Sequence, residues 1–303
     1  MSEDLRQHVV ILLRELRQRR GLGLEDVQDL TGQLGWPVSR SRLSMVERGE
    51  TDLRLSDLYA LSRSYGMSLA DMIAESLVAH GKKKFSPELS AQELFEEAKR
   101  LFNTGFPLEA AWAFDESGRR ADAADKEFIH LCMISAGHCY ERAGAIELAL
   151  RRVEKVVDHA EEGSDVYLRA VGKAAVLRAR AGSMGRSAIY AGIVEEHLNH
   201  KELSIDLRAF LLGARAAVLF RTSLIREAHQ SVLDSGRAYR KVGNFDMTAK
   251  QFATASLYAL RLGRPRTALR IAQDARGYVD SSTEVETRLL VDLAVAEALF
   301  ATG

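Results

Sequence analysis

Apolar residues recur at helical spacing through the first eighty residues of the chain. The clearest set is Val9, Leu12, Leu13 and Leu16, at positions i, i+3, i+4 and i+7. This spacing places them on one face of an amphipathic helix, which we expect to stop near Arg20-Gly21. Further apolar faces, capping residues and glycines predict four more short helices, over 24–34, 39–49, 55–66 and from 68 onward.

The third of these predicted helices carries the most informative residues. Ser39 is a good N-cap, and Gly49 suits the residue just after a helix end. Leu43 and Val46 are its expected inward positions, with Met45 less certain. The side chains expected to face outward are Arg40, Ser41, Arg42 and Ser44. Arginine can donate two hydrogen bonds to guanine, and serine can bond to a base edge or a phosphate. The candidate DNA-contacting residues are Ser39, Arg40, Ser41, Arg42, Ser44, Met45 and Arg48.

The segment 38–49 reads V-S-R-S-R-L-S-M-V-E-R-G and resembles the recognition helix of the lambda-repressor-like (XRE) helix-turn-helix family. The resemblance implies a five-helix DNA-binding domain over residues 1–80. Leu24 and Gln28 stand where the family usually has a phosphate-contacting Gln and a small residue. The connection into the third helix is also long and contains Trp36, which we expect to pack over it.

Residues 91–303 contain an internal repeat and read as entirely helical. Turn residues recur at successive spacings of 39, 38, 41, 40 and 40, at Gly105, Gly144, Gly182, Ser223, Gly263 and Gly303. Small residues stand seven positions before each marker, at Ala98, Gly137, Ala175, Ala216, Ser256 and Ala296. They also stand five positions after, at Ala110, Ala149, Ser187, Ala228 and Ala268. Small residues at both places allow two antiparallel helices to approach closely.

This pattern resembles tetratricopeptide repeats, which implies a right-handed helical solenoid with a concave groove. We expect about five hairpins plus a terminal helix, which either caps the solenoid or begins a longer natural chain. The predicted fold class is therefore all-α, with a five-helix helix-turn-helix domain followed by a tetratricopeptide-like solenoid. The predicted boundaries are 1–80 for the first domain, 81–90 for a linker and 91–303 for the repeat domain.

A column of polar residues lies two positions before the turn markers. It contains one asparagine and four arginines, and in a tetratricopeptide repeat it borders the groove. The arginines suit carboxylates or peptide carbonyls; alternatively they only offset the helix dipole and cap free carbonyls. With the neighbouring aromatic residues, the candidate ligand-binding set is Phe102, Asn103, His138, Arg142, Arg180, Phe220, Arg221 and Arg261.

The net charge of the chain does not by itself favour DNA binding. The 303 residues hold 42 Lys and Arg against 42 Asp and Glu, and residues 1–84 hold thirteen against twelve. Any affinity for DNA must then come from the local placement of basic residues. Arginines of the first helix and the run Lys82–Lys84 could contribute, although such a lysine run is also typical of a solvated linker. No apolar stretch approaches the ~18 residues of a membrane span, so we expect a cytoplasmic protein without membrane contact.

No catalytic or metal-binding pattern is present. Cys132 and Cys139 have no second pair to complete a metal site, and buried structural thiols are favoured over a redox switch. The lone histidines lack partners of a nucleophile or zinc-protease motif. We therefore predict no enzyme activity, no metal and no cofactor.

The combination of both parts resembles the peptide-responsive quorum-sensing regulators of bacteria (the RRNPP group), in which the solenoid dimerises and binds a short peptide. The resemblance implies a homodimeric, sequence-specific transcriptional regulator that reads an inverted repeat in double-stranded DNA. A short peptide or other small effector would bind in the groove. The alternative hypothesis is an interaction scaffold or adaptor, in which the repeat domain binds a partner protein and the helix-turn-helix is secondary.

Overall fold

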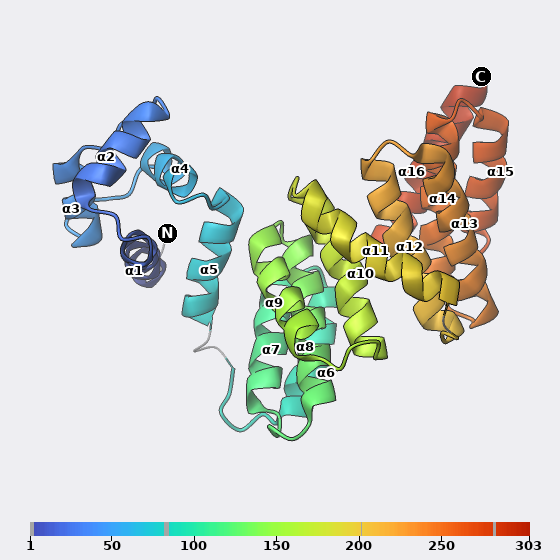
Figure 1. Ribbon diagram of the computed structural model, residues 1–303, viewed down its shortest axis with the longest axis horizontal. Coiled ribbons are helices and arrows are strands. Elements are labelled where there is room, and N and C mark those ends of the chain that lie inside the picture. Colours follow the sequence, from blue (N-terminus) through green and yellow to red (C-terminus); the bar gives the residue numbers. More distant parts are fainter. Residues whose placement is uncertain (1–2, 82–84, 201, 281–282) are drawn as a thin grey trace. The chain divides into compact units, whose positions relative to one another are not determined.

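The computed structural model describes residues 3–81, 85–200, 202–280 and 283–303. Within these ranges the chain forms sixteen α-helices and no strand, so the predicted all-α fold class is confirmed (Figure 1). The chain divides into two compact units, Met1–Arg152 and Val153–Gly303, and the division falls inside helix α9. Each unit is described by itself below.

Unit 1 begins with five short helices around a common apolar core. They are α1 (Glu3–Arg19), α2 (Leu24–Gln33), α3 (Arg40–Glu47), α4 (Leu55–Ser64) and α5 (Leu69–Gly81). Leu13, Val27, Leu43 and Leu61 are fully buried and come from four different helices. These four inward positions, expected from the apolar spacing, thus pack together.

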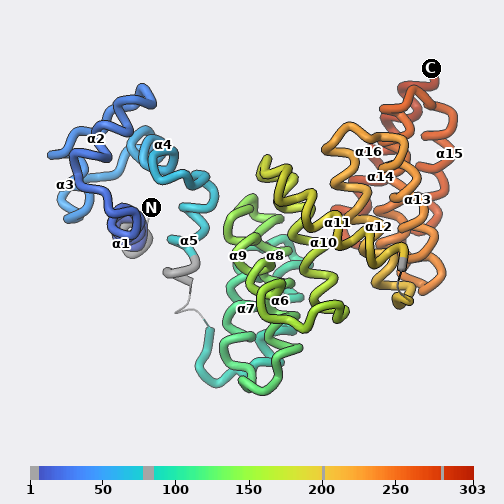
Figure 2. The backbone as a smooth tube through the Cα atoms, viewed as in Figure 1, coloured from blue at the N-terminus to red at the C-terminus, as the bar shows by residue number. Residues whose placement is uncertain are grey.

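The remaining helices form consecutive hairpins. Unit 1 holds α6 (Ala91–Asn103) with α7 (Pro107–Arg120), and α8 (Lys126–Arg142) with the start of α9 (Ile146–His159). Unit 2 holds α10 (Asp165–Arg180) with α11 (Met184–His200), α12 (Ile205–Arg221) with α13 (Ile225–Lys241), and α14 (Phe245–Arg261) with α15 (Pro265–Arg276). The last helix is α16 (Val285–Thr302), and Figure 2 follows the path of the chain through these hairpins.

The turn markers adopt the conformation that favours glycine. The backbone at Gly105, Gly144, Gly182 and Gly263 has φ between 69° and 90°. Ser223 takes the same place after α12 with φ 64°, and it is the one non-glycine with positive φ among the described residues. Left-handed backbone at these points lets each first helix of a hairpin end and the chain reverse.

The small residues at the predicted crossing points are buried. Ala98, Ala110, Ala149, Ala228 and Ala268 are all fully inaccessible. In two hairpins a serine also bonds across to the partner helix: Ser187 Oγ donates to the carbonyl of Ala175, and Ser256 Oγ to that of Ala268, both at 2.8 Å. These bonds require the close helix approach that the sequence pattern predicts.

The sixth copy of the pattern departs from the others. Ala296 is exposed, whereas Ala294 and Ala298 are the buried alanines of α16. The described chain gives α16 no second helix, and the helix packs against α14 and α15. Its other side exposes a row of large apolar residues, namely Val285, Leu289, Leu293 and Phe300.

Helix α5 packs against the first repeat hairpins as well as against α1. The carboxylate of Asp71, 1% exposed, accepts hydrogen bonds from the backbone N–H groups of Glu147 and Leu148, at 2.9 and 3.2 Å. Glu75 forms an ion pair with Arg151. Because of these contacts the compact unit includes both sides of the predicted 81–90 linker, and the domain boundary there stays a prediction.

Candidate functional site

Helix α3 begins and ends at the residues expected from its sequence. Ser39 Oγ accepts a hydrogen bond from the backbone N–H of Arg42, and Gly49 has φ 73°. Leu43 and Val46 are fully buried in the domain core. One face of this short helix is therefore anchored, which leaves the opposite face for contact with another molecule.

Two arginine–carboxylate pairs hold α3 against its neighbours. Arg17 of α1 donates to both carboxylate oxygens of Glu47, at 2.6 and 2.7 Å, and both side chains are largely buried. Arg42 of α3 donates from Nε and Nη2 to Asp57 Oδ2 of α4, at 3.0 and 2.8 Å. Paired donors with fixed planar geometry orient a helix more strictly than apolar contact alone.

Arg42 thus differs from the expectation that it faces outward. Its guanidinium also donates to Thr51 Oγ1 and to the carbonyl of Asp52. These bonds use the side chain to tie α3 to the loop before α4, because Asp57 lies within reach on a neighbouring helix. Arg17 is committed in the same way to Glu47, so neither arginine is available to DNA without breaking a partly buried pair.

The other predicted contacts remain on or near the surface. Ser39, Arg40, Ser41 and Arg48 are exposed, while Ser44 and Met45 are half-buried. Arg40 pairs with Glu25 of α2, with both side chains more than 60% exposed. Arg48 pairs with Glu50 and donates to Ser44 Oγ at 2.8 Å. Exposed pairs of this kind contribute little, ~0–1 kcal/mol, so these side chains can exchange partners readily.

Two structural residues in α2 were not identified from the sequence. Gln28 Oε1 accepts from the backbone N–H of Arg40 at 2.8 Å, so the side chain that departs from the family pattern caps α3. Thr31 Oγ1 accepts from the backbone N–H of Val38 at 3.0 Å. Both bonds join residues that are several positions apart along the chain, so no local sequence pattern predicts them.

Trp36 lies in this loop, with its ring edge-on to Tyr59 of α4 at 5.8 Å between centroids. The indole is 52% exposed, so it covers the loop only in part. The Lys82–Lys84 run, named above as a possible aid to DNA binding, lies outside the described residues.

In unit 1 three of the predicted ligand residues come together. The rings of Phe102 and His138 lie 5.2 Å apart, and the guanidinium of Arg142 lies 5.7 Å from the Phe102 ring. His138 Nδ1 is 3.7 Å from Glu141. Asn103 is exposed at the end of α6. This cluster joins the C-terminal parts of α6 and α8.

In unit 2 the predicted ligand residues occupy the ends of α10, α12 and α14. Phe220 stacks on Tyr258 with ring centroids 4.4 Å apart. Burial raises the pKa of Tyr258 to about 12, against the lowering effect of the nearby Arg221 guanidinium. Arg180, Arg221 and Arg261 are exposed in the last turns of their helices. Both the groove interpretation and the helix-capping interpretation fit this placement.

Other chemistry is sparse in the described part of the chain. Cys132 and Cys139 are buried free thiols, and burial raises the pKa of Cys132. No group of three or more potential metal ligands occurs among the described residues. No helix in the same ranges is long and apolar enough to cross a bilayer.

Comparison with known proteins bears on the first domain directly. Residues 8–75 match the family described as "Helix-turn-helix domain". Over 61 residues the chain is 41% identical to the HTH-type transcriptional regulator DdrOP3 of Deinococcus deserti, a match covering 20% of this chain and 43% of that protein's length. Residues 8–75 are therefore a helix-turn-helix domain, as predicted.

Solved structures of other proteins resemble this chain over nearly its whole length. The fold is similar to that of Bacillus thuringiensis PlcR in complex with the peptide PapR7 and DNA, with a TM-score of 0.53, 12% identity and coverage of 95% of this chain and 99% of that one. ComR from S. thermophilus, in complex with DNA and its signalling peptide ComS, matches with a TM-score of 0.49, 13% identity and coverage of 97% and 100%. The first likeness confirms a helix-turn-helix domain followed by a tetratricopeptide-like helical domain.

Proposed function

We propose that this chain, with its helix-turn-helix domain at residues 8–75, is a sequence-specific DNA-binding regulator of transcription. The observation that carries the proposal is the construction of α3. Its inner face is fixed by Leu43, Val46 and two arginine–carboxylate pairs, while Arg40, Ser41 and Arg48 are presented outward. A rigid short helix with guanidinium and hydroxyl groups on one side suits readout of bases and phosphates in the major groove.

Arg40 is the first candidate for contact with base edges. It stands in the first turn of α3, and recognition helices contact base edges mainly through their N-terminal residues. Ser39, Ser41, Ser44, Met45 and Arg48 would supply the surrounding phosphate and base contacts. Arg42 supports α3 through Asp57 instead, which revises its role from readout to positioning.

We further infer that the regulator acts as a homodimer on an inverted repeat and that its repeat domain binds a small effector. The solved structure of PlcR, whose fold is similar, shows that protein in complex with the peptide PapR7 and DNA. The arginines at the ends of α10 and α12, Arg180 and Arg221, are the first candidates for effector contact. A short peptide is the favoured effector class, since guanidinium groups bind both carboxylates and peptide carbonyls.

The test uses a duplex selected by the protein from a random-sequence pool, with binding measured by fluorescence anisotropy. Arg40→Ala should lower specific affinity by ~1–3 kcal/mol and relax the preference at one base pair. Binding to non-specific duplex should change much less. Unchanged specific affinity in Arg40→Ala would exclude this residue from readout.

Two matched variants sharpen this measurement. Glu25→Gln removes the carboxylate that pairs with Arg40, so specific affinity should rise by roughly two- to fivefold, in line with an exposed pair of ~0.5–1 kcal/mol. Arg63→Ala changes an exposed arginine in the last turn of α4, outside the recognition helix, and should leave specific affinity unaltered. Equal losses in Arg40→Ala and Arg63→Ala would indicate a general charge effect.

The competing function is an interaction scaffold. The balance of charge in the first domain favours it, as does the use of Arg17 and Arg42 in internal pairs. A scaffold would select no sequence from the random pool and would bind any duplex weakly. Recovery of a defined motif would exclude it.

A further inference from the structure

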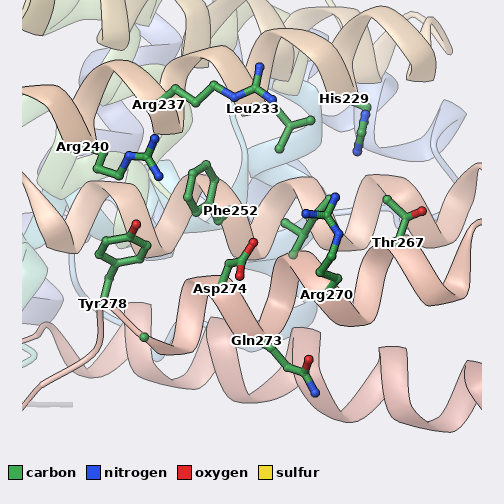
Figure 3. A pocket seen from close by; sticks show the side chains of 12 residues that line it. His229, Leu233, Arg237, Arg240, Phe252, Thr267, Arg270, Gln273, Asp274 and Tyr278 are labelled. Atoms are coloured by element: carbon green, nitrogen blue, oxygen red, sulfur yellow. The ribbon is translucent and has the colours of Figure 1, made fainter.

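A pocket of about 740 Å³ opens in unit 2 between α13 and α15, with α14 beneath it (Figure 3). One stripe of α13 lines it, at His229, Leu233, Arg237 and Arg240. A matching stripe of α15 faces it, at Thr267, Arg270, Ile271 and Asp274. The spacing of three and four residues puts each set on one helix face. These helices are the second members of their hairpins, whereas the predicted groove residues lie on first members.

The floor of the pocket is aromatic. The Phe252 ring of α14 lies under α13, where a Cβ at Gly236 would come within 2.6 Å of it. Glycine at position 236 is therefore what lets the ring occupy this place. Tyr278 packs edge-on to Phe252 with centroids 6.0 Å apart and also lines the pocket. This floor suits a flat apolar group.

The walls carry an excess of positive charge. Arg237 is paired with Asp234 at 2.9 Å. Arg240 and Arg270 line the pocket without an ion pair in the described part of the chain, and Asp274 is the acidic residue beside them. In Figure 3 the Phe252 ring lies between the guanidinium groups of Arg240 and Arg270. Two unpaired guanidinium groups against one carboxylate leave one net positive charge, which favours a monoanion over a polyanion.

A buried histidine completes the site. His229 is 9% exposed, and its Nε2 has no hydrogen-bond partner among the described residues. Burial, with Arg264 nearby, lowers the pKa of His229, so the imidazole is neutral at pH 7. An unpaired buried nitrogen is costly unless a partner satisfies it. Because His229 lines the pocket, a bound molecule can supply that partner.

We propose that this pocket binds a small organic monoanion with an aromatic body. Its carboxylate, or another acidic group of the same charge, pairs with the guanidinium group of Arg240 or Arg270, and its ring packs on Phe252 and Leu233. The pocket volume fits such a ligand, since sites for small molecules span ~300–1,000 Å³. This site is separate from the peptide contacts proposed at the ends of α10 and α12, and it does not depend on them.

The experiment titrates the full chain with 1-naphthoate by isothermal calorimetry and compares 1-naphthalenemethanol, a neutral molecule of similar shape. The proposal expects saturable 1:1 binding of naphthoate, at least about tenfold tighter than the alcohol. Equal affinity for the two probes would overturn it, since the guanidinium groups would then contribute nothing. Absence of naphthoate binding up to ~10 mM would overturn it as well.

Variants locate the binding. The double variant Arg240→Gln with Arg270→Gln should weaken naphthoate binding by about tenfold or more and leave the alcohol unchanged. Arg266→Gln, an exposed arginine of α15 outside the pocket, is the matched control and should bind as the parent does. All the substituted arginines are exposed, so thermal unfolding without ligand should stay close to that of the parent. Retained affinity in the double variant would place the probe elsewhere and refute the assignment.

Discussion

Ser223 shows how a single residue can hold a backbone conformation that suits glycine better. It follows α12 with φ 64°, where the other described hairpin markers are glycine. A side chain in this region is strained, although glycine also makes the unfolded chain more flexible. We predict that Ser223→Gly raises the free energy of unfolding by ~0.5–1 kcal/mol, measured by thermal and denaturant unfolding.

The reciprocal substitution provides the control. Gly263 holds φ 69° after α14, and no described atom beyond its chain neighbours lies within 4 Å of where a Cβ would stand. Gly263→Ser should therefore destabilise through backbone strain alone, by ~1 kcal/mol. If Ser223→Gly lowers stability while Gly263→Ser raises it, the strain argument fails for both turns.

His229 gives unit 2 a predictable response to acid. Its pKa is lowered in the folded state from the ordinary value of 6.5, mainly by burial. As the pH falls through 6.5, the unfolded chain takes up a proton that the folded chain resists, so the free energy of unfolding decreases. We predict that His229→Gln reduces the loss of melting temperature between pH 7.5 and 5.5, measured in parallel on the parent. An identical loss in both proteins would contradict the assignment to this imidazole.

Residue-level predictions from the sequence succeeded where the determining partner is local. Ser39 as a cap and the glycines as turn residues depend on neighbours within a few positions. Arg42 differed from expectation because its partner, Asp57, is fifteen residues away on another helix. Gln28 was seen only as a departure from a pattern, since its bond to the Arg40 N–H spans twelve residues. Such contacts become visible only once the helices are packed.

At the level of helices, the hydrophobic spacing predicted most of the arrangement. The three-residue and four-residue spacing placed Leu13 and Leu43 inward, and the 40-residue repeat indicated the hairpins with a final unpaired helix. Ala296 of α16 was the exception, because burial there depends on a partner helix that the described chain does not provide. The pocket over Phe252 was also not predicted, since it arises between two hairpins rather than within one.

Asp71 forms a double cap at the start of α9, because its carboxylate accepts from two backbone N–H groups there, and this makes one residue important for the packing of α5. As the third residue of α5 it bonds with Ser68 Oγ at 2.5 Å, and it also accepts from two N–H groups at the start of α9. A negative charge at a helix N-terminus adds a favourable electrostatic term. We predict that Asp71→Asn lowers the free energy of unfolding of unit 1 by ~1–2 kcal/mol, measured by chemical denaturation.

Asp29→Asn is the matched control, because Asp29 is an exposed carboxylate of α2 in the same domain. It should change stability by less than ~0.5 kcal/mol. Equal effects of the two substitutions would show that net charge, rather than the double cap, accounts for the loss.

Sequence composition and the compact units of the structure divide the chain at different places. The sequence changes character at residues 81–90, whereas the compact units divide inside α9. The difference arises from side chains of α5, chiefly Asp71 and Glu75, that bond to α9. Composition reports how a segment is built, but it does not report which neighbour that segment contacts.

The proposed reading of DNA by a homodimer leads to a prediction at the same scale. Two copies of α3 reading an inverted repeat should lie about one helical turn, ~34 Å, apart on the duplex. Hydroxyl-radical footprinting on the selected site should then show two protected regions ~10 base pairs apart, with native mass spectrometry giving two chains per duplex. A single protected region bound by one chain would rule out the dimer.

The double cap at Asp71 also provides an intrinsic reporter. The backbone N–H groups of Glu147 and Leu148 are first-turn donors of α9, which have no partner within their own helix and rely on the Asp71 carboxylate from α5. Their hydrogen–deuterium exchange should be slow while α5 is docked and fast whenever it separates. Two amide signals in the repeat region would thus record, without any added label, how long the DNA-binding domain remains attached to its neighbour during each cycle of binding and release.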